Sequence, residues 1–232
     1  MSMSSTDKGL LTPANCAVIF IDHQPQMFFG GADMDWEDLL KNVLVLARAA
    51  KMFGVPVILT AMESGEFDGG IAPQLLDLFP GQPPLRRSGM NAWDDQRFVA
   101  AVRDTGRRNF LMAGLWSEAC LAFPALQMLE EGFGVYVVKD ASHGTNPAAQ
   151  DTALRRVERA GGVAVAALQV LLEFQRDWAR AEHCDEVTAI VKERCCGYAP
   201  GAERPATMIQ TTAASGNRRR SQQTVKRKEF NT

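Results

Sequence analysis

A cysteine stands where a strongly apolar stretch changes into a helical pattern. The segment GLWSEACLAFP at 114–124 follows the apolar run FLMAG and leads into a helical pattern over 121–133. At the start of a helix, the sulfur of Cys120 would meet unpaired N–H groups and the positive end of the helix dipole, and both favour a thiolate. Free cysteines are also among the most buried residues in proteins. Cys120 is therefore interpreted either as a nucleophile or as a packing residue.

A cysteine nucleophile needs a base and a nearby positive charge. Asp22 ends the apolar run CAVIFID at 16–22 and could receive the thiol proton. Arg86 or Arg87, in a segment over 64–90 rich in glycine and proline, could place a cation over the sulfur. An arginine keeps its charge, so its role would be electrostatic. Asp22, Cys120 and one of these two arginines form the predicted catalytic group.

Alternating strands and helices would bring these residues to one edge of a sheet. Short apolar runs predict strands at 16–22, 55–61, 108–114, 134–142 and 162–168. Apolar residues at helical spacing predict helices over 36–54, 94–106, 121–133, 147–162 and 168–182. This alternation predicts an α/β fold with one parallel sheet and helices on both faces. Ligands of such sheets bind beyond the carboxyl ends of the strands, where Asp22, Asp140 and the 114–120 turn fall.

The composition is that of an ordinary globular protein. The chain has 232 residues, 46% of them hydrophobic, and a net charge of -2, which gives no reason to expect a nucleic acid or a membrane as partner. Five cysteines without regular spacing argue against a secreted disulfide framework. No secretory signal pattern and no apolar run of about 18 residues is present. We expect a cytoplasmic protein with reduced thiols.

The C-terminal segment differs in kind from the rest. We expect a globular domain over 10–198 and a basic, flexible tail over 199–232. Residues 204–232 carry seven Arg or Lys side chains and one acid, a local charge of +6. Such a run is read as a nucleic-acid or localisation patch or as a solvated tail, and the scarcity of large apolar side chains favours the tail.

Motifs for common cofactors are missing. The sequence has no GxxxxGK[ST] motif and no GxGxxG motif after the first predicted strand. Its histidines, His23, His143 and His183, do not have zinc-ligand spacing. We therefore expect no cofactor and no metal, and we interpret His23 and His143 as residues that satisfy loop backbone.

Six motifs occur in order that resemble the isochorismatase-like cysteine hydrolases, and most closely the YcaC-type subgroup. They are DHQ at 22–24, NAWD at 91–94, TGR at 105–107, GLWSEACLAFPAL at 114–126, EEGF at 130–133 and DAS at 140–142. The resemblance covers roughly residues 10–180. It implies a three-layer, Rossmann-like α/β/α fold with a central, mainly parallel sheet, a hydrolase domain over 10–198, a homo-oligomer and a small-molecule substrate.

The resemblance also assigns a catalytic triad of an aspartate, a basic residue and a cysteine. By motif position these are Asp22, Arg87 and Cys120. Arg87 stands four residues before Asn91, the usual gap, and Arg86 is held in reserve. The family residue at this position is usually Lys, so arginine is a departure that excludes proton shuttling.

Family members carry a cis peptide bond before the nucleophile, and the matching bond here is Leu115–Trp116. Such a bond costs about 3 kcal/mol and would turn the N–H groups of Trp116 and Cys120 toward an oxyanion. Ser117 stands where Thr is common. We also expect the pKa of Cys120 to be depressed.

Other residues of the predicted pocket carry weaker indications. Gln24, Glu63, Arg86 and Ser117 could offer polar contacts to a ligand, although such side chains more often satisfy loop backbone. Nicotinamidases of the superfamily bind a metal through an acid and two histidines, but the matching stretch LTAMESGEFDGG has no histidine. A metal-dependent nicotinamidase is therefore not expected.

The sequence thus predicts a cysteine hydrolase that cleaves an amide-type C–N bond of a small molecule through a thiolate and an acyl-enzyme. Two alternatives stay open. One is a vinyl ether hydrolase of the isochorismatase type, which need not use the cysteine. The other is an inactive oligomeric binding or scaffold protein of the same fold. A redox-sensing cysteine is a further option, weakened by the lack of a neighbouring resolving cysteine.

Overall fold

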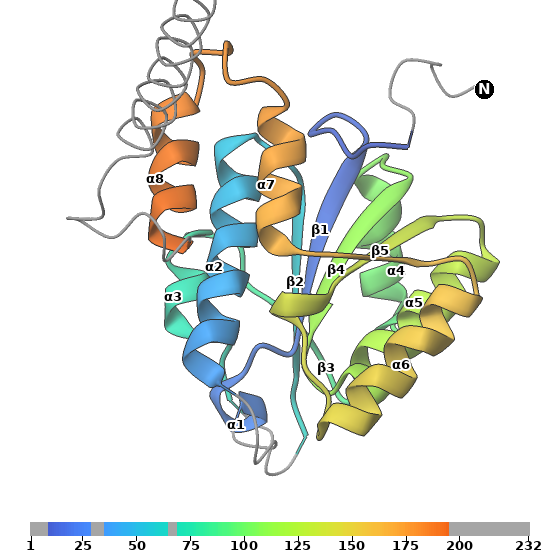
Figure 1. The fold of residues 1–232 in the computed structure, drawn as a ribbon. Coiled ribbons are helices and arrows are strands. Elements are labelled where there is room, and N and C mark those ends of the chain that lie inside the picture. The colour runs from blue at the N-terminus through green and yellow to red at the C-terminus, as the bar shows by residue number, and fades with distance from the viewer. Residues whose placement is uncertain (1–8, 29–34, 65–68, 195–232) are drawn as a thin grey trace, which may run out of the picture. The chain divides into compact units, whose positions relative to one another are not determined.

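The computed structural model describes residues 9–28, 35–64 and 69–194 (Figure 1). The chain divides into two units, residues 1–187 and residues 188–232. Every strand and the helices up to Gln175 belong to the first unit. The predicted domain boundary at 198 and the basic tail over 199–232 lie outside the described residues, and both stay predictions.

A six-stranded sheet forms the centre of the first unit. Its strands are β1 (Cys16–Ile21), β2 (Val57–Met62), β3 (Leu85–Arg87), β4 (Asn109–Gly114), β5 (Gly134–Val138) and β6 (Val163–Val165). They lie in the order β3-β2-β1-β4-β5-β6, and every neighbouring pair is parallel. The predicted parallel sheet is confirmed. The chain runs outward from β1 through β2 to the edge strand β3, then crosses back to place β4 on the other side of β1.

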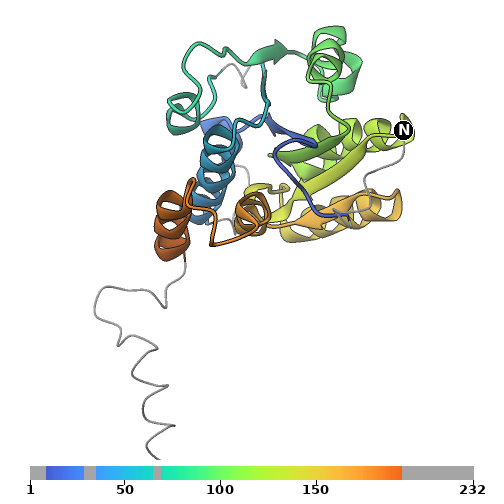
Figure 2. The ribbon, with the colours of Figure 1, turned by 90° about the horizontal axis from the view of Figure 1, so that it is seen from above.

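Helices cover both faces of this sheet, as predicted for a three-layer α/β/α fold. The helices are α1 (Pro25–Phe28), α2 (Trp36–Met52), α3 (Pro73–Leu76), α4 (Gln96–Asp104), α5 (Ala122–Glu130), α6 (Pro147–Arg159), α7 (Ala167–Gln175) and α8 (Cys184–Arg194). Helices α2 and α7 pack together on one face, and α4, α5 and α6 lie on the other (Figure 2). Among the described residues, no helix is both long enough and apolar enough to cross a membrane.

The strands are buried because their side chains enter a core on each face. Every residue of β1 is buried, since helices cover the strand from both sides. Its residues Ala17, Ile19 and Ile21 share one core cluster with apolar side chains of α4, α5 and α6. Burial on both faces explains why the strand reads as a continuous apolar run rather than an alternating pattern.

The structure differs from the predicted elements in four of its helices and strands. The segment 64–90 contains an unpredicted edge strand, β3, whose sequence is only Leu-Arg-Arg and therefore has no apolar run to reveal it. The helix predicted over 168–182 ends at Gln175, because Arg176 adopts a left-handed φ of 63°. The helix α8 was not predicted. Strand β6 is also shorter than the predicted strand over 162–168.

His23 supports the loop that follows β5. Its Nε2 atom lies 3.0 Å from the carbonyl oxygen of Ala141, and its ring packs edge-on against Phe20 at a centroid distance of 5.7 Å. The side chain is fully buried, and this burial lowers the pKa of His23 to about 4. The predicted role of His23 in satisfying loop backbone is confirmed.

Acid should destabilise the fold through His23. Its pKa in the unfolded chain is about 6.5, so the unfolded chain binds a proton more readily than the folded one as the pH falls from about 6.5 to about 4. We expect this residue to remove about 3 kcal/mol of the free energy of unfolding across that window. Urea unfolding of the wild type and His23→Gln at pH 7, 5.5 and 4.5 measures the difference. Parallel stability curves for the two proteins would contradict the expectation.

Candidate active site

Three strand ends bring Asp22, Arg87 and Cys120 together at the carboxyl edge of the sheet. Asp22 directly follows β1, Arg87 is the last residue of β3, and Cys120 lies in the turn after β4. Asp22 and Cys120 are fully buried, and Arg87 is 4% exposed. All three therefore share a small, largely dehydrated volume, in which electrostatic interactions are strong.

An ion pair joins Asp22 to Arg87. The Arg87 Nη2 atom donates to Asp22 Oδ2 at 2.5 Å. The reserve candidate Arg86 instead points to the surface, where its Nη1 atom lies 3.1 Å from Glu63 Oε1 and both side chains are about half exposed. The structure thus brings Arg87 into the cluster and leaves Arg86 and Glu63 outside it.

The Cys120 thiol is held in its neutral form. Burial, and then the negative charge of Asp22, raise the pKa of Cys120 to about 12, although the charge of Arg87 opposes this change. The predicted depressed pKa is therefore wrong. The prediction was based on the helix terminus and the cation. It did not weigh the complete burial of the thiol or the negative charge of Asp22, and both disfavour a thiolate.

The Asp22 carboxylate interacts with the Cys120 thiol. Burial raises the pKa of the Asp22 carboxyl, and the charge of Arg87 and hydrogen bonds from Cys120 and Arg87 oppose that rise. Asp22 Oδ1 is buried and has no hydrogen-bond partner among the described residues. A carboxylate with a raised pKa is a stronger base than a solvated one.

The turn that carries Cys120 reverses the chain without a cis peptide bond. Every peptide bond within residues 9–28, 35–64 and 69–194 is trans, so the cis bond predicted at Leu115–Trp116 is absent there. Instead, Trp116 adopts left-handed backbone angles of φ 55° and ψ 64°, and residues Ser117–Leu121 form a π-helical turn that leads into α5. A bulky residue in this region is strained.

One of the two predicted oxyanion donors, the Cys120 N–H group, also requires correction. The Cys120 N–H group donates to the Trp116 carbonyl oxygen at 3.0 Å, and the Ala119 N–H group donates to the same oxygen at 2.9 Å. The Cys120 N–H group is therefore engaged within the turn. It does not face an empty oxyanion position, because its hydrogen bond to the Trp116 carbonyl oxygen lies within the π-helical turn.

A second loop holds this turn in place. Ser142 Oγ accepts a hydrogen bond from the Gly114 N–H group at 3.1 Å, and the His143 carbonyl oxygen accepts one from the Ser117 N–H group at 3.0 Å. The Glu118 carboxylate accepts from both the backbone N–H and the hydroxyl of Thr145, at 3.1 and 2.5 Å. The loop over 142–145 thus fixes the turn on both sides of Trp116.

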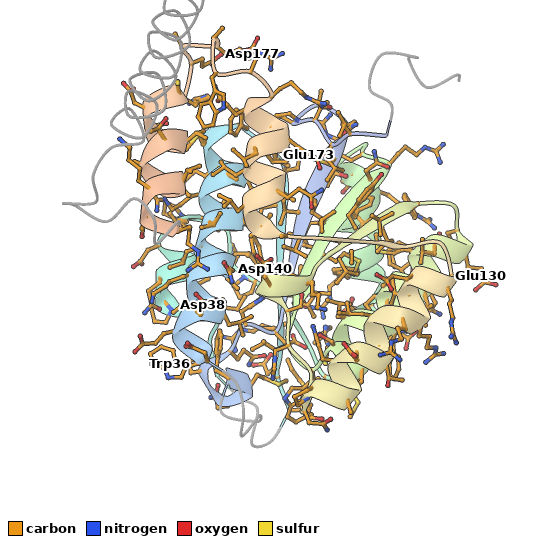
Figure 3. The ribbon with its side chains drawn as sticks, viewed as in Figure 1. Trp36, Asp38, Glu130, Asp140, Glu173 and Asp177 are labelled. Carbon is orange, nitrogen blue, oxygen red and sulfur yellow. The ribbon has the colours of Figure 1, made fainter. Side chains whose placement is uncertain are left out.

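Several predicted or neighbouring polar residues serve the backbone. Gln24 is fully buried and brackets Met62, donating to its carbonyl oxygen at 3.0 Å and accepting from its N–H group at 2.8 Å. Asp140, labelled in Figure 3, accepts from the Ala167 N–H group at 2.8 Å at the start of α7. Ser117 is buried, and its hydroxyl has no hydrogen bond within the described part of the chain.

Sequence reasoning missed three supporting residues, Thr60, Glu118 and Thr145. Thr60 Oγ1 accepts a hydrogen bond from Arg87 Nε at 3.1 Å. Glu118 lies within the quoted motif around Cys120, so its position offered a signal. Thr60 lies inside an apolar strand, where nothing in the pattern distinguishes it from its neighbours. Among the described residues, no cluster of His, Cys, Asp and Glu side chains is arranged to hold a metal ion.

Comparison with known proteins identifies the family of the chain. The sequence model of the isochorismatase domain matches residues 16–169. The chain belongs to the isochorismatase family.

Within the isochorismatase family, the similarity is to YcaC proteins. The chain is 40% identical over 166 residues to the probable hydrolase YcaC of Escherichia coli K12, covering 71% of this chain and 79% of that protein. The structure of YcaC from Pseudomonas aeruginosa, solved with hexane-2,5-diol and covalent acrylamide, is 35% identical with a TM-score of 0.77, covering 91% of this chain and all of that one. The YcaC structure from Escherichia coli, described as an octameric hydrolase of unknown specificity, is 32% identical with a TM-score of 0.77, covering 89% of this chain and 97% of that one.

Replacing Glu118 should loosen the turn that carries Cys120. Glu118→Ala removes the charged acceptor of two hydrogen bonds from Thr145, and we expect the free energy of unfolding to fall by about 2 kcal/mol. Urea unfolding measures this loss. Glu130→Ala, at an exposed position at the end of α5 (Figure 3), is the matched control. An equal loss in both variants would show that the Thr145 contact does not stabilise the turn.

Proposed function

We propose that this protein is a cysteine hydrolase that cleaves an amide-type C–N bond of a small molecule. The observation that carries the proposal is the buried contact of a thiol, a carboxylate and a guanidinium at the carboxyl edge of the sheet. In this group Cys120 is the nucleophile, Asp22 the general base and acid, and Arg87 the fixed positive charge.

Acylation uses the raised basicity of Asp22. The carboxylate takes the thiol proton as the sulfur attacks the carbonyl carbon, so that a thiolate with an unfavourable pKa need not accumulate. The S–C bond forms while the carbonyl π electrons move to oxygen. Asp22 then gives the proton to the leaving nitrogen, the C–N bond breaks, and an amine and a thioester remain.

Deacylation repeats the same proton transfers with water. Asp22 removes a proton from a water molecule as its oxygen attacks the thioester carbonyl carbon. The C–S bond breaks, the sulfur regains its proton from Asp22, and a carboxylic acid leaves. Arg87 keeps its charge throughout and stabilises the ionised Asp22 at the start of each half.

Two YcaC relatives support this proposal. The Escherichia coli relative is named a probable hydrolase, and the structure of the Pseudomonas aeruginosa relative contains covalent acrylamide. Acrylamide reacts with nucleophilic thiols, and the Cys120 thiol interacts with both the Asp22 carboxylate and the Arg87 guanidinium. We infer that acrylamide modifies Cys120 in this protein.

We also propose that the protein forms a homo-oligomer, since the Escherichia coli relative is octameric. Several large apolar side chains are exposed on the single chain, among them Trp36, Leu172 and Trp178. Burial of such side chains is a common driving force for subunit association. Light scattering coupled to size-exclusion chromatography tests the proposal, and a monomer at micromolar concentration would overturn it.

Cys120→Ala should abolish hydrolysis, and Asp22→Asn should slow it by about 10²- to 10⁴-fold, because it removes the general base. A panel of small primary amides, with ammonia release as the readout, tests both variants. Cys16→Ala is the matched control, since Cys16 is also a buried thiol but donates to the Thr12 carbonyl oxygen at 3.0 Å. Wild-type turnover by Cys120→Ala would show that amide hydrolysis does not use this cysteine, and would overturn the proposal.

The same assay should show a loss of activity in acid. Asp22 acts as a base only when ionised, and its pKa is raised by burial. As the pH is lowered, activity should therefore be half lost at a pH above the ordinary aspartate pKa of about 3.9. Rates measured from pH 4 to pH 9, on protein shown to remain folded, give the midpoint. A midpoint at or below the ordinary value would remove Asp22 from the role of base.

A further inference from the structure

Thr60 lies between the two strands that carry the charged residues of the site. It belongs to β2, which is the strand between β1 and β3. In the sheet it pairs with Ile21, the residue before Asp22, and with Leu85, two residues before Arg87. Its side chain is fully buried. Any polar group at this position therefore needs a partner inside the protein.

Thr60 holds both members of the ion pair through different atoms. Its carbonyl oxygen accepts a hydrogen bond from the Asp22 N–H group at 3.0 Å. Its hydroxyl oxygen accepts a hydrogen bond from Arg87 Nε at 3.1 Å. The first contact belongs to the backbone and any residue could make it. The second depends on a hydroxyl group at this position.

The contacts of Arg87 use the whole fork of the guanidinium group. The Nε atom meets Thr60, the Nη1 atom donates to the carbonyl oxygens of Gly89 and Met90, and the Nη2 atom donates to Asp22. Because the guanidinium is planar, contacts at Nε and Nη1 determine where Nη2 points. A lysine has a single nitrogen in place of these three, so it could not reproduce the separate contacts at Nε, Nη1 and Nη2.

We propose that Thr60 is a positioning residue, whose hydroxyl fixes the plane of the Arg87 guanidinium so that Nη2 reaches Asp22 beside the Cys120 thiol. The inference rests on the proposed function, because the orientation matters for chemistry at Cys120. Removing the hydroxyl leaves the backbone bond to Asp22 intact but lets the guanidinium rotate. The electrostatic interaction between the guanidinium and the Cys120 thiol then weakens.

Alkylation of Cys120 by acrylamide tests the proposal without a substrate. Thr60→Val keeps the shape of the side chain and removes the hydroxyl, whereas Thr60→Ser keeps the hydroxyl. Since Arg87 lowers the pKa of Cys120, we expect Thr60→Val to react about tenfold more slowly at neutral pH and to have its rate profile displaced to higher pH. Thr60→Ser should restore the wild-type profile. Thr152→Val, at an exposed position on α6, is the control.

A double-mutant cycle separates positioning from a general loss of structure. In the Arg87→Lys background the Thr60 hydroxyl has lost its guanidinium partner, so Thr60→Val should change the alkylation rate by less than about twofold there. Equal effects in the two backgrounds, or a wild-type profile for Thr60→Val, would overturn the proposal. If Thr60→Val does not fold, Thr60→Ala compared with Thr60→Ser gives the same contrast.

Crystal structures of Thr60→Val and Thr60→Ser distinguish this inference from the proposed function. If acrylamide does not label Cys120 in the native wild type, the proposed cysteine chemistry fails. The positioning role is then decided by the Arg87 side chain alone. A guanidinium displaced from Asp22 in Thr60→Val but retained in Thr60→Ser supports the role of Thr60. An unchanged guanidinium in both variants overturns it.

Discussion

The buried ion pair of Asp22 and Arg87 is the interaction on which the site depends. Removing two charges from water costs several kcal/mol for each ion, and their mutual attraction offsets this only when further hydrogen bonds complete the geometry. Here the guanidinium finds those bonds at Thr60, Gly89 and Met90. Strands β3, β2 and β1 therefore have to be placed accurately, because a small shift would leave a charge buried without its partner.

The sheet meets this demand through its topology. The order β3-β2-β1-β4 carries Arg87, Thr60, Asp22 and the Cys120 turn on successive strands, so each group is fixed by a hydrogen-bonded neighbour. Two residues at adjacent strand ends leave the sheet through left-handed backbone, Asp22 at φ 56° and Trp116 at φ 55°. These turns hold the chain close to the sheet and direct the carboxylate and the thiol into the same buried volume.

The sequence predicted the parts of this site that local patterns encode. Asp22 and Cys120 follow continuous apolar runs, and such runs are the clearest signal of a buried parallel strand. Strand β3 was missed because three residues with two arginines carry no periodicity. The pKa of Cys120 was predicted in the wrong direction, since it depends on complete burial and on a carboxylate about a hundred residues distant in the chain. The role of Thr60 depends on its neighbours in the sheet, which its own strand does not reveal.

The burial that keeps the Cys120 thiol neutral also affects how readily the thiol is oxidised. Peroxide and other oxidants attack the thiolate, and exposed cysteines of low pKa are the first to be converted to sulfenic and sulfinic acids. Cys120 has neither property, because it is fully buried and its pKa is raised to about 12. A thiol that is almost always protonated spends little time in the form that oxidants attack. The burial and the raised pKa that leave little thiolate at Cys120 should therefore slow its oxidation in the resting protein.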